Sequence, residues 1–197
     1  MKQLPNFISI FRTLLAIFIA LVVLGNPEKK DVLLFAFWFT WLVIILDGID
    51  GIIARKIKAT SEFGAFFDIA CDRITELIYI SLFAILKWIP FWVLIVFLVR
   101  GVLVDGIRGF ASKEGKTAFG KKSMMETKIG YFLTSSRFMR ALYGGIKAIA
   151  FAIMFLVHLY DTRFLVVGDF FIYFATFLCI IRGLPVLIEG KKFFKQI

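Results

Sequence analysis

Four aspartates stand close together in an otherwise apolar part of the sequence. Asp47 and Asp50 are three positions apart, and Asp68 and Asp72 are four positions apart. On an α-helix, each of these spacings places both side chains on the same face. A carboxylate in the middle of a membrane span costs about 2.5–3.5 kcal/mol on insertion scales. Four of them therefore indicate a polar site in which a ligand compensates their charge.

The residue types indicate which ligand this is. A short polar segment separates the two acidic pairs, so we expect an antiparallel helix hairpin in which Asp47 and Asp50 face Asp68 and Asp72. Carboxylates without His or Cys favour hard cations such as Mg²⁺, Mn²⁺ or Ca²⁺ over zinc. Four carboxylates are more than one Mg²⁺ usually takes from a protein. Two divalent cations about 3.5–4 Å apart, bridged by a substrate phosphate, fit better.

Small residues and one arginine accompany the aspartates. Gly51 and Ala54 follow the first acidic pair, and Gly64 precedes the second. They leave room for a bulky ligand to approach the backbone, and Arg55 can neutralise phosphate oxygens with its planar fork of donors. Glycines in membrane spans are also common packing contacts. That explanation suits each residue taken alone, but it does not explain why all of them surround the aspartates.

The elements that position these residues are predicted to cross a membrane. Of the 197 residues, 60% are hydrophobic, whereas a typical soluble domain is only about 45–50% apolar. A hydrocarbon core ~30 Å thick requires about 20 helical residues. We expect an all-α integral membrane protein with one domain over residues 1–197. Its six transmembrane helices cover roughly 7–24, 32–54, 63–86, 91–111, 130–160 and 164–188.

The charged residues predict the orientation of these helices. Lys and Arg number 24 against 14 Asp and Glu, which gives a net charge of +10. Most basic residues, with Arg12 and Arg182 counted among them, fall on one side of the predicted spans. The positive-inside rule then places both termini in the cytoplasm. Attraction to anionic lipids is a second explanation of the surplus. Nucleic-acid binding is disfavoured, because the cations flank apolar spans.

The acidic segment resembles the signature of the CDP-alcohol phosphotransferase family, D-x2-D-G-x2-A-R-x8-G-x3-D-x3-D. The fixed positions of that signature are here Asp47, Asp50, Gly51, Ala54, Arg55, Gly64, Asp68 and Asp72. The resemblance implies transfer of a phosphatidyl group from CDP-diacylglycerol to the hydroxyl of a polar alcohol, with release of CMP. It assigns the four aspartates to two divalent cations, Mg²⁺ or Mn²⁺, and Asp72 also to general base catalysis. The glycines, the alanine and the arginine would surround the nucleotide and its diphosphate.

The same resemblance implies where the enzyme works and in what form. Family members are typically homodimers with a polar, metal-containing cavity that opens to the cytoplasm. We therefore expect a homodimer in the cytoplasmic (inner) membrane, in contact with membrane lipids, with its active site facing the cytoplasm.

Cations in the fourth and fifth predicted spans suggest an anionic acceptor. The candidate residues for binding the alcohol are Arg100, Arg108, Lys128, Arg137 and Arg140. Basic residues inside a membrane are functional candidates by default, and several converging cations suit a phosphorylated alcohol. As alternatives, Arg108 could pair with Asp105 three positions earlier, and Arg137 and Arg140 could lie at the level of the lipid headgroups.

Two further features resemble the family members that use glycerol 3-phosphate. These are the N-terminal run from Pro5 to Arg12 and the spacing of eight residues from Arg100 to Arg108. Glycerol 3-phosphate is therefore the leading acceptor. Inositol phosphate is the second candidate, and serine follows.

A small cation transporter with an aspartate-lined path is the alternative from another class. Transporters place carboxylates on broken helices near the bilayer midplane, often within inverted repeats. The four aspartates instead lie near the predicted cytoplasmic helix ends, beside Arg55 and the glycines, and no inverted repeat is evident. The enzyme is favoured for these reasons.

Overall fold

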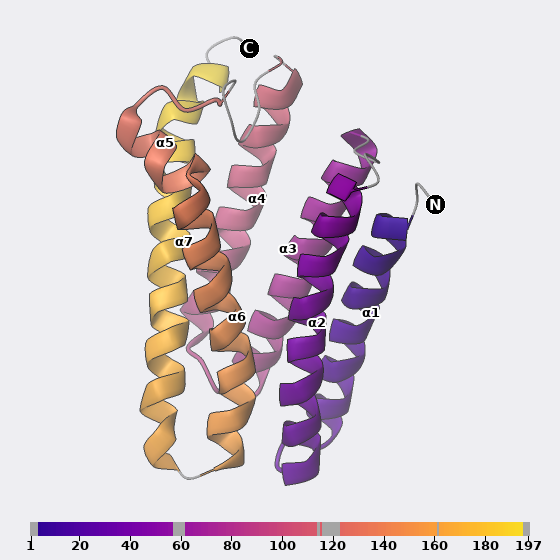
Figure 1. Ribbon diagram of the computed structural model, residues 1–197. Coiled ribbons are helices and arrows are strands. Elements are labelled where there is room, and N and C mark those ends of the chain that lie inside the picture. Colours follow the sequence, from indigo (N-terminus) through magenta and orange to yellow (C-terminus); the bar gives the residue numbers. More distant parts are fainter. Residues whose placement is uncertain (1–3, 57–61, 114, 116–122, 161, 195–197) are drawn as a thin grey trace. The chain divides into compact units, whose positions relative to one another are not determined.

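The computed structural model describes residues 4–56, 62–113, 115, 123–160 and 162–194. Side chains at 4–5, 50–63, 65, 113, 162 and 192–194 lie outside this description. The described residues form helices and no strand, which confirms the all-α prediction for this part of the chain. The elements are α1 (Leu4–Gly25), α2 (Lys30–Lys56), α3 (Glu62–Ile85), α4 (Phe91–Lys113), α5 (Lys128–Ser135), α6 (Arg137–Leu159), the 3-10 helix η1 (Thr162–Phe164) and α7 (Leu165–Phe194) (Figure 1).

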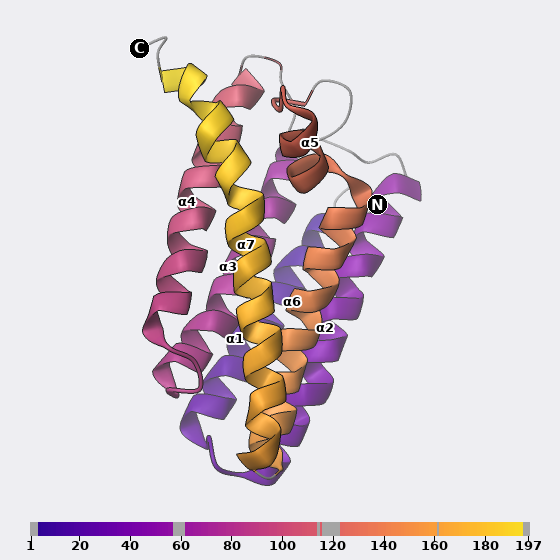
Figure 2. The ribbon, with the colours of Figure 1, turned by 90° about the vertical axis from the view of Figure 1, so that its left-hand side faces the viewer.

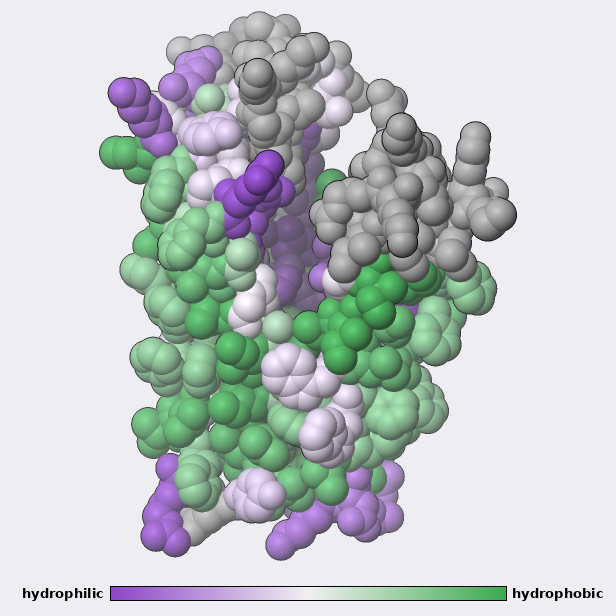
Figure 3. Space-filling model, viewed as in Figure 1, coloured by the Kyte–Doolittle hydropathy of each residue, from purple (hydrophilic) through white to green (hydrophobic). Residues whose placement is uncertain are grey.

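Four of these helices are long and apolar enough to cross a membrane. They contain the segments Asn6–Gly25, Lys30–Ile49, Arg137–Leu159 and Leu165–Lys191. Their exposed surface is rich in apolar side chains, such as Phe18 on α1 and Phe170 on α7, and hydrophobic residues cover most of the face seen in Figure 3. Helices α3 and α4 are more highly charged, because they carry predicted site residues such as Asp68 and Arg100. The count of six spans stays a prediction.

The chain forms two compact units. The first comprises Met1–Leu94 and Ala148–Asp169, and the second comprises Ile95–Lys147 and Phe170–Ile197. In the first unit, α1 packs against both α2 and α3 (Figures 1 and 2).

The core of the first unit is aromatic. Tyr79 and Phe83 are buried on α3, and the ring centroid of Tyr79 lies 5.1 Å from that of Phe151 on α6. Phe83 meets Phe155 edge to face at 5.3 Å. The Thr40 hydroxyl on α2 donates a hydrogen bond of 3.1 Å to the Tyr79 hydroxyl, which satisfies a buried polar group. The hydrogen bond joins α2 to α3, and the ring contacts join α3 to α6.

In the second unit, α4 and α7 pack closely. Their shared core contains Val104 and Ile107 from α4 and Val186 from α7. A Cβ atom at Gly190 would lie 2.6 Å from Cγ2 of Ile107, and one at Gly183 would lie 2.9 Å from Cγ of Arg100. Glycine at these two positions therefore allows the side chains of α4 to lie directly on α7.

The prediction of one continuous helix over 130–160 is wrong, because the chain breaks at Ser136 into α5 and α6. Ser136 has an extended backbone (φ −64°, ψ 146°), and its N–H donates to the carbonyl of Tyr131 at 3.2 Å. Its hydroxyl accepts a hydrogen bond from the N–H of Met139 at 3.2 Å, so it caps the start of α6. Serine and threonine compete for backbone hydrogen bonds in this way, which hydropathy does not reveal.

Candidate active site

Three of the four predicted metal ligands converge on one arginine in the first unit. Asp47 on α2 accepts a hydrogen bond from Nη1 of Arg12, which comes from α1. Nη2 of Arg12 lies 2.6 Å from Oδ1 of Asp72 and 3.6 Å from Oδ1 of Asp68, both on α3. The structure therefore brings Asp47 of α2 together with Asp68 and Asp72 of α3 around Arg12. Their catalytic and metal-binding roles stay predictions.

The polar face of α1 completes this site. Ser9 and Thr13 lie three positions before and one position after Arg12, and all three residues are buried. The Ser9 hydroxyl donates to Oδ1 of Asp68 at 3.1 Å. The hydroxyls of Thr13 and Thr75 are 3.4 Å apart. We therefore define the acidic site as Asp47, Asp68 and Asp72 together with Ser9 and Arg12.

Burial differs sharply between the arginine and the carboxylates of the acidic site. The Arg12 side chain is 4% exposed, whereas those of Asp47, Asp68 and Asp72 are 48%, 45% and 46% exposed. Three carboxylates against one guanidinium leave a formal charge of −2 (3 × −1 plus 1 × +1). The described acidic site thus carries excess negative charge on half-exposed side chains, whereas Arg12 is buried. Arg73 does not change this balance, because it pairs with Glu76.

The donor set of the acidic site suits hard divalent cations. Its ligand atoms are carboxylate oxygens, which Mg²⁺ and Mn²⁺ prefer, and the three carboxylates already converge on a cation, the Arg12 guanidinium. Among the described side chains, no three acidic, His or Cys residues yet stand close enough to hold an ion. The chemistry fits a metal centre, but in this arrangement the arginine stands among the carboxylates.

Five predicted site residues remain to be placed. Asp50, Gly51, Ala54 and Arg55 belong to α2, but their side-chain positions lie outside the described residues. Gly64 is half-buried in the first turn of α3, four positions before Asp68. Their roles at the nucleotide and diphosphate stay predictions.

A second group of polar side chains surrounds Tyr143 on α6, in the second unit. The guanidinium carbons of Arg100 and Arg182 lie 5.7 Å and 5.1 Å from the centroid of the Tyr143 ring, and Nζ of Lys147 lies 5.2 Å from it. These separations are within the range of cation–π attraction. We call these four residues the cation cluster.

The arginines of the cation cluster are buried and firmly held. Nη1 of Arg182 donates to the carbonyl of Met139 at 2.7 Å, and Nη2 lies 3.3 Å from the carbonyl of Thr134. The stem of Arg100 lies against Gly183. The Nε atoms of both arginines are buried without a hydrogen-bond partner in the part of the chain that is described. Because buried donors normally have acceptors, two N–H groups there can still receive an anion.

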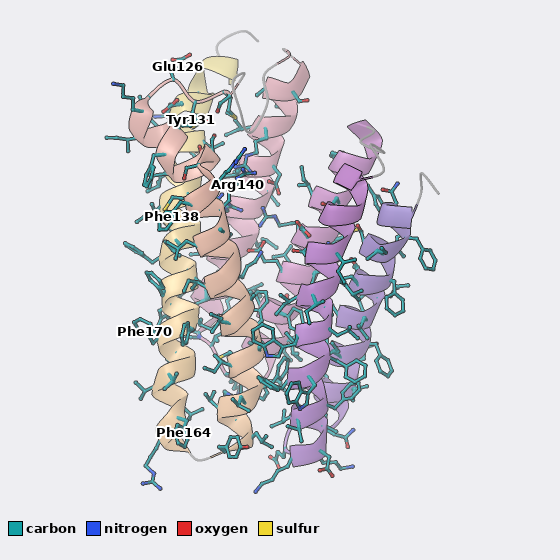
Figure 4. All side chains as sticks on the ribbon, viewed as in Figure 1. Glu126, Tyr131, Phe138, Arg140, Phe164 and Phe170 are labelled. Carbon is teal, nitrogen blue, oxygen red and sulfur yellow. The ribbon has the colours of Figure 1, made fainter. Side chains whose placement is uncertain are left out.

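The five predicted acceptor residues divide into two sets. Arg100 belongs to the cation cluster, and Arg140 lies close enough to Arg182 for electrostatic interaction (Figure 4). Arg108 instead lies 3.9 Å from Asp105, as the alternative explanation anticipated. Lys128 and Arg137 are exposed at the first positions of α5 and α6.

Sequence reasoning missed Arg12, Arg182 and Tyr143. The sequence analysis uses both arginines only as charges that set the orientation of the spans, but they are 3% and 5% exposed. The sequence did contain an indication that Arg12 belongs to a polar site, because Ser9 and Thr13 share its face on an otherwise apolar helix. No comparable signal marked Tyr143, whose position depends on the helix break at Ser136.

The fold and the acidic site together define the class of protein. A helical chain with several apolar helices and carboxylates converging from two of them is typical of a membrane enzyme. Residues 2–181 match the profile of the CDP-alcohol phosphatidyltransferase family. Since this match covers most of the chain, the protein belongs to that family, as the eight-residue signature predicted.

Similar proteins agree with this assignment. A Rickettsia felis protein named CDP-diacylglycerol--glycerol-3-phosphate 3-phosphatidyltransferase is 29% identical over 202 residues, which cover 98% of both chains. Proteins of the same name from Wigglesworthia glossinidia brevipalpis and Mycoplasma genitalium are 26% and 32% identical over 121 and 125 residues. Those two matches cover 58% and 56% of this chain, and 63% and 53% of the respective relatives.

Proposed function

We propose that this protein transfers the phosphatidyl group of CDP-diacylglycerol to glycerol 3-phosphate and releases CMP, as a step of phospholipid biosynthesis. The observation that carries the proposal is the convergence of Asp47, Asp68 and Asp72 at one point of the first unit. Family membership and the relative that matches along its whole length support the same reaction.

The reaction forms one phosphorus–oxygen bond and breaks another. A hydroxyl oxygen of glycerol 3-phosphate attacks the phosphorus that carries the diacylglycerol. The bond from this phosphorus to the oxygen shared with CMP breaks, and CMP leaves with that oxygen. A carboxylate within hydrogen-bond reach accepts the hydroxyl proton. We assign this role to Asp72, whose side chain is 46% exposed and can therefore reach a substrate hydroxyl.

Divalent metal ions complete the proposed site. Asp47, Asp50, Asp68 and Asp72 would hold two Mg²⁺ or Mn²⁺ ions, which would neutralise the negative charge that builds on the diphosphate as CMP leaves. The formal charge of −2 on the described acidic site supports this part of the proposal.

The cation cluster supports a phosphorylated acceptor. Arg100 and Arg182 each present a buried Nε donor without a partner among the described residues, and Lys147 adds a third positive charge. A dianionic phosphate would satisfy those donors and offset the repulsion among the cations. Serine, which carries no phosphate, would leave these charges uncompensated. Of the five predicted acceptor residues, we therefore retain Arg100 and Arg140 in the proposed acceptor site, and we add Arg182 and Lys147 to them.

The remaining parts of the proposal concern the whole protein. We propose a single catalytic domain, because the family profile spans residues from both units. We propose six transmembrane helices with both termini and a polar cavity on the cytoplasmic side, supported by four apolar helices and by the distribution of charge. Assembly as a homodimer in the cytoplasmic membrane is proposed from the family resemblance.

The test is a transfer assay with purified protein and radiolabelled CDP-diacylglycerol. CMP release should require both a divalent cation and glycerol 3-phosphate, and EDTA should abolish it until Mg²⁺ or Mn²⁺ is restored. If the protein preferred inositol phosphate or serine, the proposed acceptor would be wrong, but the proposed transfer reaction would stand. Failure to release CMP with any alcohol would refute the enzymatic function. Metal flux into proteoliposomes should then be measured, as expected of a cation transporter.

A further inference from the structure

We propose that Arg12 and the divalent metal ions compete for the same carboxylates. In this view, the guanidinium holds Asp47, Asp68 and Asp72 together when no metal is bound, and it gives up part of these contacts when the metal enters. The inference rests on the proposed metal site and adds to it a residue outside the family signature.

Arg12 lies among the proposed metal ligands. Arg12 contacts Oδ1 of all three aspartates, with Nη2 only 2.6 Å from Asp72. Mg²⁺ binds oxygen ligands at about 2.0–2.1 Å and requires a compact, nearly octahedral set. With the guanidinium among them, the described acidic side chains do not form a group that could hold an ion. Ligation by all three carboxylates therefore requires the arginine to move from the centre of the group.

The positive charge of Arg12 also opposes metal binding at the same carboxylates. The acidic site carries a formal charge of −2 with Arg12 in place, so it still attracts a divalent cation. A cation bound at the same oxygens would, however, lie within a few ångströms of the guanidinium, where like charges repel strongly in a partly desolvated site. Arg12 should therefore lower the affinity for metal, even though it keeps the ligands together.

Helix α1 holds Arg12 beside the three carboxylates. Ser9 and Thr13 flank Arg12 on the same buried face and bind Asp68 and Thr75. The Arg12 side chain is 4% exposed, whereas those of Asp47, Asp68 and Asp72 are about half-exposed. A metal ion can therefore reach the exposed parts of the carboxylates while Arg12 stays buried on α1.

The experiment measures Mn²⁺ binding to the purified full-length chain without substrate, through loss of the electron paramagnetic resonance signal of free Mn²⁺. Arg12→Gln should bind Mn²⁺ about tenfold more tightly than wild type, because one repelling charge is gone. Arg73→Gln is the matched control, since it removes an arginine that pairs with Glu76 instead. Its affinity should stay close to wild type.

A second readout separates competition from simple loss of structure. Thermal unfolding of Arg12→Gln in EDTA should occur at a lower temperature than in wild type, because three carboxylates are left without their counter-ion. Saturating Mn²⁺ should raise the melting temperature of this variant more than that of wild type, as mass action requires of the tighter binder.

Chemical complementation tests the same point directly. Millimolar guanidinium chloride should weaken Mn²⁺ binding to Arg12→Ala but not to wild type, and an equal concentration of NaCl should not. If neither truncated variant can be purified, Arg12→Lys keeps the charge but cannot reach all three carboxylates at once. It should bind Mn²⁺ more tightly than wild type, by a smaller factor than that expected for Arg12→Gln.

The outcomes distinguish this inference from the proposed function. Equal or weaker Mn²⁺ binding by Arg12→Gln, or by Arg12→Lys in its place, would overturn the competition and make Arg12 a residue that only positions the ligands. Absence of Mn²⁺ binding in wild type itself, or binding unaffected by Asp68→Asn, would instead refute the metal site.

Discussion

Arg12 and Asp72 are joined by a contact of 2.6 Å between Nη2 and Oδ1, although 60 positions separate them in the sequence. This contact ties the first helix of the chain to the residue proposed as the general base. It also joins a buried arginine to a half-exposed carboxylate.

Asp72→Asn should reduce kcat by about 10²–10⁴-fold, the range expected when a general base is lost. Equilibrium binding of CDP-diacylglycerol in excess Mg²⁺ should change much less, because asparagine keeps the size and one oxygen of the side chain. Asp105→Asn, which alters a carboxylate paired with Arg108, is the control and should leave kcat near wild type. A parallel loss of substrate binding in Asp72→Asn would show that its main role is to bind metal.

Arg140→Ala should raise the KM for glycerol 3-phosphate about tenfold, with a smaller effect on the KM for CDP-diacylglycerol. A hydrogen bond to a charged group contributes about 1.5–3 kcal/mol, and 1.4 kcal/mol corresponds to a factor of ten. Arg137→Ala should have a clearly smaller effect, because Arg140, and not Arg137, is described as interacting electrostatically with Arg182 of the cation cluster. Steady-state kinetics with each substrate varied in turn provide the comparison. Equal effects of the two variants would assign both residues to the lipid headgroup region.

Gly183→Ala should displace Arg100. The added Cβ would stand 2.9 Å from Cγ of that arginine, closer than ordinary contacts allow. We expect a higher KM for glycerol 3-phosphate and a small fall in melting temperature, since the long side chain can shift. Gly106→Ala on α4 serves as the control, because a Cβ there meets nothing within 4 Å. An unchanged KM in Gly183→Ala would remove Arg100 from the acceptor site.

Ser136→Ala should destabilise the start of α6. The variant loses the hydroxyl that accepts from Met139 N, and loss of an N-cap costs about 0.5–2 kcal/mol. Ser136→Asn retains an oxygen that can cap the helix and should recover most of that stability. Thermal unfolding in one detergent and one metal concentration measures the difference. If alanine and asparagine behave alike, the cap does not stabilise the helix break.

The sequence predicted the acidic hairpin better than its surroundings. Helix periodicity places Asp68 and Asp72 on one face of α3, and the short polar segment between the acidic pairs predicts that α2 and α3 are neighbours, so the convergence with Asp47 could be expected. Arg12 was misjudged because a hydropathy pattern counts charges but does not tell which neighbouring helix faces them. The burial of Arg12 depends on the packing of α1 against two other helices, which local sequence does not encode.

The cation cluster was predicted only in part for a related reason. Arg100 and Arg140 stood out as charges in apolar segments, whereas Arg182, inside the predicted span 164–188, was counted only among the basic residues that set the orientation. Its place at the Tyr143 ring was not predicted, and neither were the close approach of α4 and α7 and the break at Ser136. The close approach and the break depend on small or hydroxylated residues, whose effect on a long apolar segment is not visible in average hydropathy.

The location of Arg12 in α1 also bears on how the protein is made. The ribosome delivers α1 before α2 and α3, so the positive charge precedes the aspartates into the membrane. Isolated carboxylates are costly there, and a newly made hairpin carrying Asp47, Asp68 and Asp72 meets an ion-pair partner as soon as it packs on α1. The acidic residues can therefore be partly neutralised by Arg12 as soon as the three helices pack.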